Sequence, residues 1–151
     1  MVKKHGPERI YMNDKVFIDT NILVYAHDLD AGEKYKKANE LILNLWESRT
    51  AVISTQVLQE FYVTLTGKIP RPLAGNIALG IISSYLSWEV ITNRPDNILL
   101  ASEIEYRNKI SFWDALIVSA AYEGNVKIIF TEDLNHGQYI EGIKIQNPFM
   151  N

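Results

Sequence analysis

The sequence predicts an α/β fold in which helices cover both faces of a mainly parallel β-sheet. Short apolar runs alternate along the chain with longer segments that have the period of amphipathic helices. The connections between these segments are short, which is typical of βαβ units. Crossovers in such units are right-handed, and they therefore place helices on both sides of the sheet.

The composition is that of an ordinary globular protein. Hydrophobic residues make up 47% of the 151 positions and charged residues 22%, a length and balance that suit one domain. There is no cysteine, which excludes a disulfide framework and leaves zinc with only three histidines and the carboxylates. The N-terminus, MVKKHGPERIY, lacks the apolar core of a signal peptide, and no apolar run approaches the roughly 20 residues that span a bilayer. We therefore expect a soluble, cytoplasmic protein.

The net charge bears on the kind of partner. It is −3 at pH 7, whereas proteins that bind nucleic acid mainly by neutralising phosphates are usually basic. The argument weakens where several carboxylates hold a divalent cation, because the bound ion reverses the sign of the local field. The charge therefore argues only mildly against a nucleic-acid partner.

Hydrophobic periods and capping residues give the order of the elements. Residues 1–14 have no clear period, so we predict a partly disordered N-terminal extension before a single domain over 15–151. Asp30 with Glu33 fits the capping pattern of a helix, and Ser111 caps a later one. The predicted strands cover 15–19, 51–54, 88–92, 127–130 and 143–146, and the predicted helices cover 21–27, 31–48, 55–67, 72–86, 95–108 and 112–123.

Two aspartates follow buried strands. Asp19 ends the first strand, and Asp133 follows the strand over 127–130 after Thr131 and Glu132. Because the carboxyl ends of parallel strands meet at one edge of a sheet, side chains there point into the crevice where open α/β sheets bind ligands. Each aspartate also has a purely structural interpretation, Asp19 as a helix cap and Asp133 as part of a polar turn.

Two further carboxylates lie on predicted helices. Asp114 belongs to FWDALIVSAA, which is apolar almost all round, and an ionised carboxylate on a buried face needs hydrogen bonds or a metal. Its structural interpretation is a capping box with Ser111. Glu60 belongs to VLQEFYVTL and lies on the flank of the apolar face, where it reaches either a cleft or solvent.

Taken together, the four carboxylates point to a metal site. Clustered carboxylates repel one another unless a cation neutralises them. Oxygen ligands without cysteine or suitably spaced histidine favour Mg²⁺ or Mn²⁺. Such ions activate water and stabilise the in-line displacement of a phosphoryl group. The pattern predicts metal-dependent cleavage of a phosphodiester, with Thr20 and Asn21 placed to hydrogen-bond Asp19 or a bound ligand.

These carboxylates occur in four segments, FIDTNILVYA, TQVLQEFYVTLT, FWDALIVSAA and IIFTEDLNHGQ. In this order and spacing the segments resemble the acidic motifs of PIN-domain ribonucleases, and in particular of VapC-type toxins from bacterial toxin–antitoxin pairs. The likeness runs from about Lys15 to Phe149. It implies a three-layer α/β/α sandwich with a parallel sheet ordered 3-2-1-4-5. It also implies a Mg²⁺- or Mn²⁺-dependent endoribonuclease, often a homodimer, that a small cognate antitoxin inhibits.

The resemblance also assigns roles to single residues. Asn21 matches a polar residue that orients the first aspartate, and Thr131 matches the Ser or Thr of the fourth motif. Glu132 leaves open which acid of that motif faces the metal, and the match favours Asp133. The implied products carry a 5′-phosphate and a 3′-hydroxyl. The catalytic and metal-site positions are matched by Asp19, Glu60, Asp114 and Asp133.

Four basic residues are weaker candidates for contacts with RNA phosphates, and solvated surface charge is the alternative interpretation of each. They are Lys68, Arg71, Arg94 and Arg107.

Other functions have their own requirements. A haloacid-dehalogenase-like phosphatase needs a second aspartate two residues after the first, where this chain has Asn21. A receiver-like Mg²⁺-binding interaction module needs a phosphoacceptor aspartate after a central strand, whereas the strand over 88–92 is followed by Asn93 and Arg94. A catalytically inactive PIN fold that only binds proteins is a third possibility, and the presence of all four carboxylates argues against it.

Overall fold

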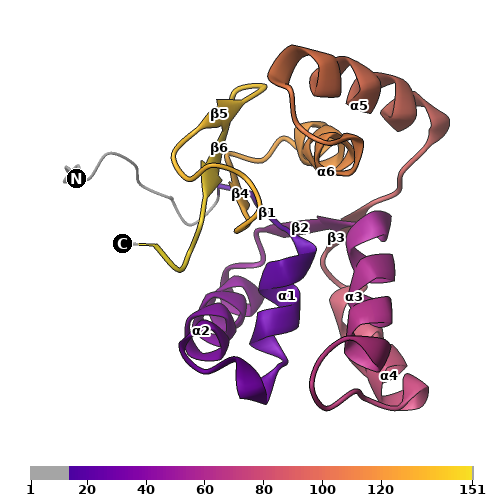
Figure 1. Cartoon of the computed structure of the whole chain (residues 1–151), viewed down its shortest axis with the longest axis vertical. Coiled ribbons are helices and arrows are strands. Elements are labelled where there is room, and N and C mark those ends of the chain that lie inside the picture. Colours follow the sequence, from indigo (N-terminus) through magenta and orange to yellow (C-terminus); the bar gives the residue numbers. More distant parts are fainter. Residues whose placement is uncertain (1–13, 151) are drawn as a thin grey trace.

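A six-stranded β-sheet runs through the middle of the molecule and separates two groups of helices (Figure 1). The computed structural model describes residues 14–150. Apart from Asp14, the predicted extension over 1–14 lies outside the described residues, and the single domain over 15–151 stays a prediction.

The order of the strands in the sheet is β3-β2-β1-β4-β6-β5. The neighbours from β3 to β6 pair in parallel, and only β5 pairs antiparallel with β6. The predicted order 3-2-1-4-5 is thus confirmed, with β6 as the fifth parallel strand. The strands are β1 (Val16–Ile18), β2 (Ala51–Ser54), β3 (Glu89–Ile91), β4 (Ile128–Phe130), β5 (Tyr139–Ile140) and β6 (Ile143–Gln146).

The antiparallel edge strand β5 was not predicted. It joins β6 through a two-residue turn in which both residues have positive φ, 52° at Glu141 and 79° at Gly142. A tight hairpin of this kind is usually marked by Asn-Gly or Asp-Gly. Glu-Gly is a weaker signal, which explains why the sequence pattern did not reveal the hairpin.

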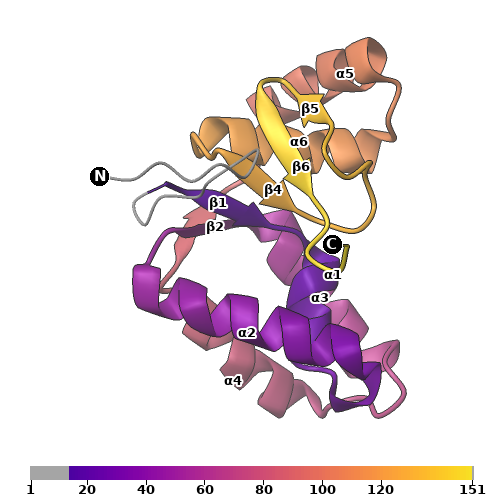
Figure 2. The same ribbon diagram turned by 90° about the vertical axis from the view of Figure 1, so that its left-hand side faces the viewer.

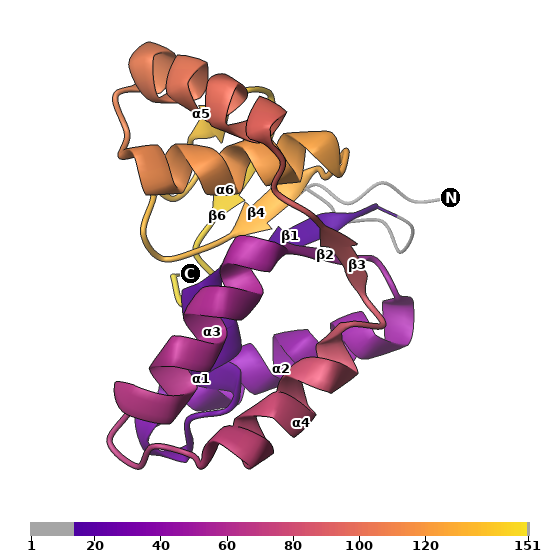
Figure 3. The same ribbon diagram turned by 90° about the vertical axis from the view of Figure 1, so that its right-hand side faces the viewer.

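The helices form a layer on each face of the sheet, as the predicted α/β/α sandwich requires. Helix α6 lies between the sheet and α5 (Figure 3), whereas α2 and α4 lie on the opposite side (Figure 2). Helices α1 and α3 belong to this second layer (Figure 1). The helices are α1 (Thr20–Ala26), α2 (Glu33–Ser48), α3 (Thr55–Gly67), α4 (Gly75–Tyr85), α5 (Pro95–Asn108) and α6 (Phe112–Glu123).

Helix α2 starts two residues later than predicted. A 3₁₀ turn over Leu29–Ala31 occupies the preceding segment, and Asp28 caps this turn. Gly32, with φ 64°, then opens α2 without a side-chain cap. The predicted capping role of Asp30 is therefore wrong, because its carboxylate instead accepts two hydrogen bonds from Arg71.

Helix α4 starts at Gly75, so the start of the predicted helix at residue 72 is wrong. The backbone N–H of Leu73 donates to the carbonyl of Leu65 at 2.8 Å. This bond holds the segment after Pro72 against the end of α3, so the chain turns into a helix only afterwards.

The core consists of the buried strands and an aromatic cluster around Tyr85, the last residue of α4. All residues of β1, β2 and β4 are buried, as expected for parallel strands covered on both faces. Tyr85 is 1% exposed and its ring contacts those of His27, Trp46, Phe61 and Trp88. Within residues 14–150, no helix combines the length and apolarity needed to cross a bilayer.

We expect Tyr85→Ala to lower the free energy of unfolding by about 3 to 5 kcal/mol, because it opens a large cavity in the aromatic cluster. It also removes the hydroxyl that lies 2.6 Å from His27 Nε2. Urea unfolding at an unchanged m value measures the loss. The neighbouring residue Leu86 is 59% exposed, and Leu86→Ala should change stability by less than about 0.5 kcal/mol. Equal effects of the two substitutions would contradict the assignment of Tyr85 to the centre of the aromatic cluster.

Candidate active site

The four predicted carboxylates line one cleft of about 770 Å³. They come from four separate places: the end of β1, the middle of α3, the first turn of α6 and the loop after β4. The strands β1 and β4 are parallel neighbours, so their carboxyl ends bring two of these acids to the same edge of the sheet. The residues are Asp19, Glu60, Asp114 and Asp133.

Asp19 is the most constrained of the four. It has extended backbone geometry and caps α1, with its Oδ1 accepting from the N–H of Thr20 at 2.7 Å. Its Oδ2 accepts from the hydroxyl of Thr131 at 2.8 Å. Asp19 is therefore both a helix cap and a candidate site residue, because both of its carboxylate oxygens accept hydrogen bonds and its side chain still borders the cleft.

Glu60 is exposed on α3 and is held by two side chains. The hydroxyl of Thr20 donates to Oε1 at 2.7 Å, and the amide of Gln56 donates to Oε2 at 3.2 Å. Thr20 thus bonds Asp19 through its backbone and Glu60 through its side chain. Two of the four acids are positioned by a single residue.

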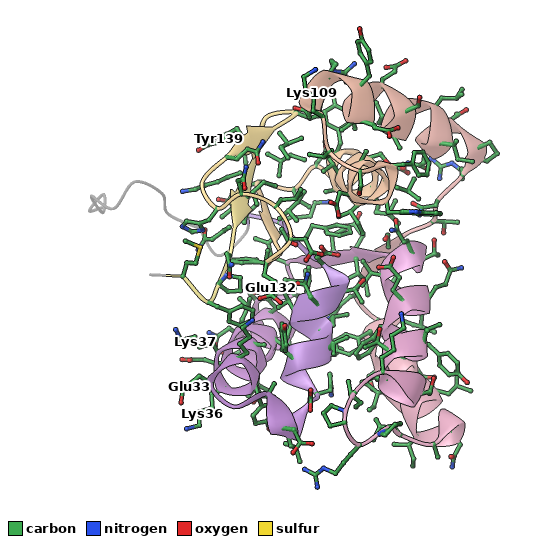
Figure 4. The ribbon with its side chains drawn as sticks, in the orientation of Figure 1. Glu33, Lys36, Lys37, Lys109, Glu132 and Tyr139 are labelled. Atoms are coloured by element: carbon green, nitrogen blue, oxygen red, sulfur yellow. The ribbon has the colours of Figure 1, made fainter. Side chains whose placement is uncertain are left out.

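Asp133 borders the cleft, whereas its neighbour Glu132 does not. Glu132 accepts from Lys34 Nζ at 2.7 Å and from the hydroxyl of Tyr25, which draws it towards α1 and α2 (Figure 4). Burial alone would raise the pKa of Glu132, but these two bonds leave it below its ordinary value. The N–H of Asp133 donates to Thr131 Oγ1 at 3.1 Å, so one hydroxyl joins both strand-end aspartates.

Asp114 is the third residue of α6. Its backbone N–H donates to the hydroxyl of Ser111 at 3.1 Å, so Ser111 is the cap of this helix. The carboxylate of Asp114 is half-buried on the wall of the cleft. Burial raises the pKa of Asp114, and the negative charges of Asp133 and Glu60 raise it further. A hydrogen bond with Ser111 opposes these effects.

The environment of the cleft raises the pKa of its aspartates. Burial raises the pKa of Asp19 from 3.8 to about 7, although hydrogen bonds from Thr131 and Thr20 oppose the shift. Loss of solvation also raises the pKa of Asp133, with further contributions from the charges of Glu132 and Glu60 and an opposing hydrogen bond from Asn21. A cation in the cleft would stabilise the ionised forms of these acids.

The donor set suits a hard divalent cation. The acids supply only oxygen ligands, and the side-chain oxygen Oδ1 of Asn21 is buried without a hydrogen-bond donor. Such ligands favour Mg²⁺ or Mn²⁺. Across residues 14–150, no group of three or more acidic or histidine side chains is already arranged to hold a metal. The acids therefore share a cleft, and binding an ion would require their side chains to draw closer together.

The four basic candidates lie in different environments. Lys68 lines the cleft. Arg71, Arg94 and Arg107 do not, and each forms ion pairs on the surface, with Asp30, Glu123 and Glu141 respectively.

Gln56 is a site residue that the sequence reasoning missed. It is 6% exposed, lines the cleft, and donates both to Glu60 and to the carbonyl of Trp113 at 3.4 Å. Its position one helical turn before Glu60 is the signal that could have indicated it, because side chains four residues apart lie together on a helix. Trp113 itself also lines the cleft, next to Asp114.

The chain matches one family model and shares its fold with several solved structures. The model of the PIN domain matches residues 16–140. No curated protein sequence matches the chain significantly. A toxin–antitoxin complex from Klebsiella pneumoniae contains a chain that matches with TM-score 0.65 at 18% identity, covering 89% of this chain and 98% of that one.

Two other structures are similar in fold. VapC20 of Mycobacterium tuberculosis, a toxin that cleaves the sarcin–ricin loop, matches with TM-score 0.60 at 18% identity, covering 79% of this chain and 90% of that one. VapBC2 of Rickettsia felis, bound to a fragment of its promoter DNA, matches with TM-score 0.61 at 23% identity, covering 87% and 97%.

We expect Asp19→Asn to stabilise the metal-free protein, and increasingly so as the pH rises. The folded state holds the proton of Asp19 up to about pH 7, whereas the unfolded state releases it near its ordinary value of 3.8. Stability is therefore lost as the pH rises between these values, and the uncharged variant avoids the loss. The gain at pH 7.5 should be at most about 4 kcal/mol, from about 1.36 kcal/mol per pKa unit.

Urea unfolding of both proteins in EDTA, from pH 4.5 to pH 7.5, measures this difference. Asp96→Asn is a matched control, because Asp96 is an exposed aspartate on α5 that does not line the cleft. A difference between Asp19→Asn and the parent chain that does not change with pH would contradict the prediction.

Proposed function

Because the chain belongs to the PIN domain family, we propose that it is a metal-dependent endoribonuclease that hydrolyses phosphodiester bonds in RNA. The observation that carries the proposal is the meeting of Asp19, Glu60, Asp114 and Asp133 in one cleft. The raised pKa values of the three aspartates support it, since a bound cation would stabilise their ionised forms.

Asp19, Asp114 and Asp133 would hold Mg²⁺ or Mn²⁺, and Glu60 assists them. When bound, the ion favours the ionised form of the attacking water and stabilises the charge that develops at the phosphate. Thr131 fixes the position of Asp19 and Asp133 by one hydroxyl. The backbone of Asp133 and the carboxylate of Asp19 are therefore held together on the sheet side of the cleft, and the carboxylates would draw closer around an ion.

Two hydrogen bonds support a role of Glu60 towards the attacking water. Thr20 and Gln56 each bond one of its oxygens, so the carboxylate is held in one position at the cleft. In this position Glu60 would order the water or help to hold the ion. A protein nucleophile is not required, and the products carry a 5′-phosphate and a 3′-hydroxyl.

A receiver-like or inactive interaction module is the alternative. Strand β3 lies at the edge of the sheet and is followed by Asn93 and Arg94, so it supplies no phosphoacceptor at a central strand. Asp19 follows a central strand, but three further acids share its cleft. These features favour the nuclease.

The biological role that we propose is the toxin of a toxin–antitoxin pair. Structures with this fold include toxin–antitoxin complexes, which suggests a small cognate antitoxin as a protein partner. We further propose a homodimer that acts on RNA in the cytoplasm.

We expect the purified protein to cleave labelled RNA with Mg²⁺ or Mn²⁺ and to be inactive in EDTA. Asp19→Asn and Asp114→Asn should each lower the rate at least about a hundredfold, because each removes a ligand of the ion that stabilises the transition state. Glu60→Gln should lower the rate roughly tenfold or more and leave the melting temperature unchanged, since Glu60 lies outside the core.

Gel analysis of the cleavage products measures these rates, and Asp96→Asn again serves as the control. Cleavage without metal would refute the metal-site mechanism. So would full activity of the folded Asp19→Asn and Asp114→Asn variants. A lower melting temperature of Glu60→Gln with normal cleavage would give Glu60 a structural role only.

The toxin proposal has a separate prediction. An adjacent reading frame should encode a short protein that co-purifies with this chain and inhibits its cleavage of RNA. Overexpression of the chain alone should arrest growth, and Asp19→Asn should abolish the arrest while still binding the partner. Harmless overexpression of an active chain, with no co-purifying partner, would refute the toxin role but leave the nuclease proposal intact.

A further inference from the structure

Trp113 is a large aromatic side chain that the proposed mechanism does not use. It is 64% exposed and lines the cleft, next to Asp114 in sequence. The other two tryptophans, Trp46 and Trp88, pack against each other and against Tyr85 in the core cluster. An exposed indole at the edge of a cleft leaves its aromatic face available to a ligand.

The neighbours of Trp113 limit its freedom. The ring of Phe112 meets it edge to face, with centroids 5.3 Å apart and an interplanar angle of 80°. Its carbonyl accepts from Gln56, which also bonds Glu60. The backbone of Trp113 is therefore linked through Gln56 to a carboxylate of the site, and the contact with Phe112 restricts the indole ring.

The cleft has little positive charge with which to hold a phosphate backbone. Among the described residues that line it, Lys68 has the only cationic side chain. The net charge of the chain is −3. Proteins that bind nucleic acid through phosphates neutralise several of them with lysine and arginine. A bound ion would add positive charge, and contacts with the bases would be a further source of affinity.

Apolar walls supply that source. Beside Trp113, the cleft is lined by Val24, Val63, Ile69, Pro70 and Ile117. A flat indole and aliphatic side chains suit the faces of nucleobases, which are available only where bases are unpaired.

We propose that Trp113 stacks on an unpaired nucleobase beside the scissile phosphate. The RNA segment is then held at this point by base stacking more than by phosphate contacts. This inference rests on the proposed nuclease function and assigns a base-binding residue to the same site. Bases inside a duplex cannot reach the indole, so paired RNA binds poorly.

Tryptophan fluorescence tests the inference directly. The probe is a pool of single-stranded RNA dodecamers of random sequence, titrated in Ca²⁺, with a gel confirming that the RNA stays intact. We expect the RNA to quench the fluorescence of Trp113. Trp113→Ala and Trp113→Leu should both bind roughly tenfold more weakly, measured by anisotropy of labelled RNA, and Trp113→Phe should bind nearly as well as the parent chain.

The leucine variant separates stacking from simple apolar contact, because it keeps an apolar side chain and loses the aromatic face. Tyr122→Ala is the matched control, since Tyr122 is 55% exposed on the same helix and does not line the cleft. Its binding should equal that of the parent chain. The same pool annealed to its complement should bind at least about tenfold more weakly.

The dependence on salt gives a second measurement. With one cation contacting phosphate, affinity should fall only roughly threefold between 50 and 200 mM salt. A fall of about a hundredfold would show that phosphate contacts dominate and would overturn the inference. Equal binding by Trp113→Leu and the parent chain, or equal binding of paired and unpaired RNA, would also overturn it.

Two further outcomes would assign Trp113 to a protein partner instead. Trp113→Ala would then bind and cleave RNA normally but fail to co-purify with the antitoxin, or its sedimentation would change from dimer to monomer. Either result overturns the inference and leaves the nuclease proposal standing. Failure of the parent chain to bind or cleave any RNA would refute both.

Discussion

The hydroxyl of Thr131 joins the parts of the candidate site. It donates to Asp19 and accepts from the N–H of Asp133, so the ends of β1 and β4 are tied together where the acids emerge. The bond also compensates in part for burying a carboxylate that is only 6% exposed. The compensation is incomplete, as the raised pKa of Asp19 indicates. The protein gives up stability at the residue on which we expect its chemistry to depend.

Hydrogen bonds around this centre decide which acids face the cleft. Thr20 and Gln56 hold Glu60 in place, and Lys34 with Tyr25 holds Glu132 away. The result is a cleft rich in carboxylates and poor in cations. Such a cleft repels a phosphate backbone until a metal ion is bound, which is why we assign to an exposed indole the task of holding RNA. The proposed metal dependence and the proposed base stacking thus have a common electrostatic origin.

Most of the fold could be predicted from local patterns. The strands that become β1, β2 and β4 are short apolar runs, and their burial on both faces makes them easy to recognise. Helices α3, α5 and α6 occupy the predicted residues because caps and periods mark their ends. The start of α2 was wrong because a 3₁₀ turn, whose signal is short, comes before it.

The sequence by itself determined which acids stand at strand ends and helix starts, because such positions follow from periods of a few residues. Only the tertiary structure decided how those acids are held. Lys34 and Glu132 are 98 residues apart, and Asp19 and Thr131 are 112 apart. Local patterns carry no information on such pairs, since they form only when distant strands and helices pack together. The choice of Asp133 over Glu132 at the cleft therefore belongs to the fold.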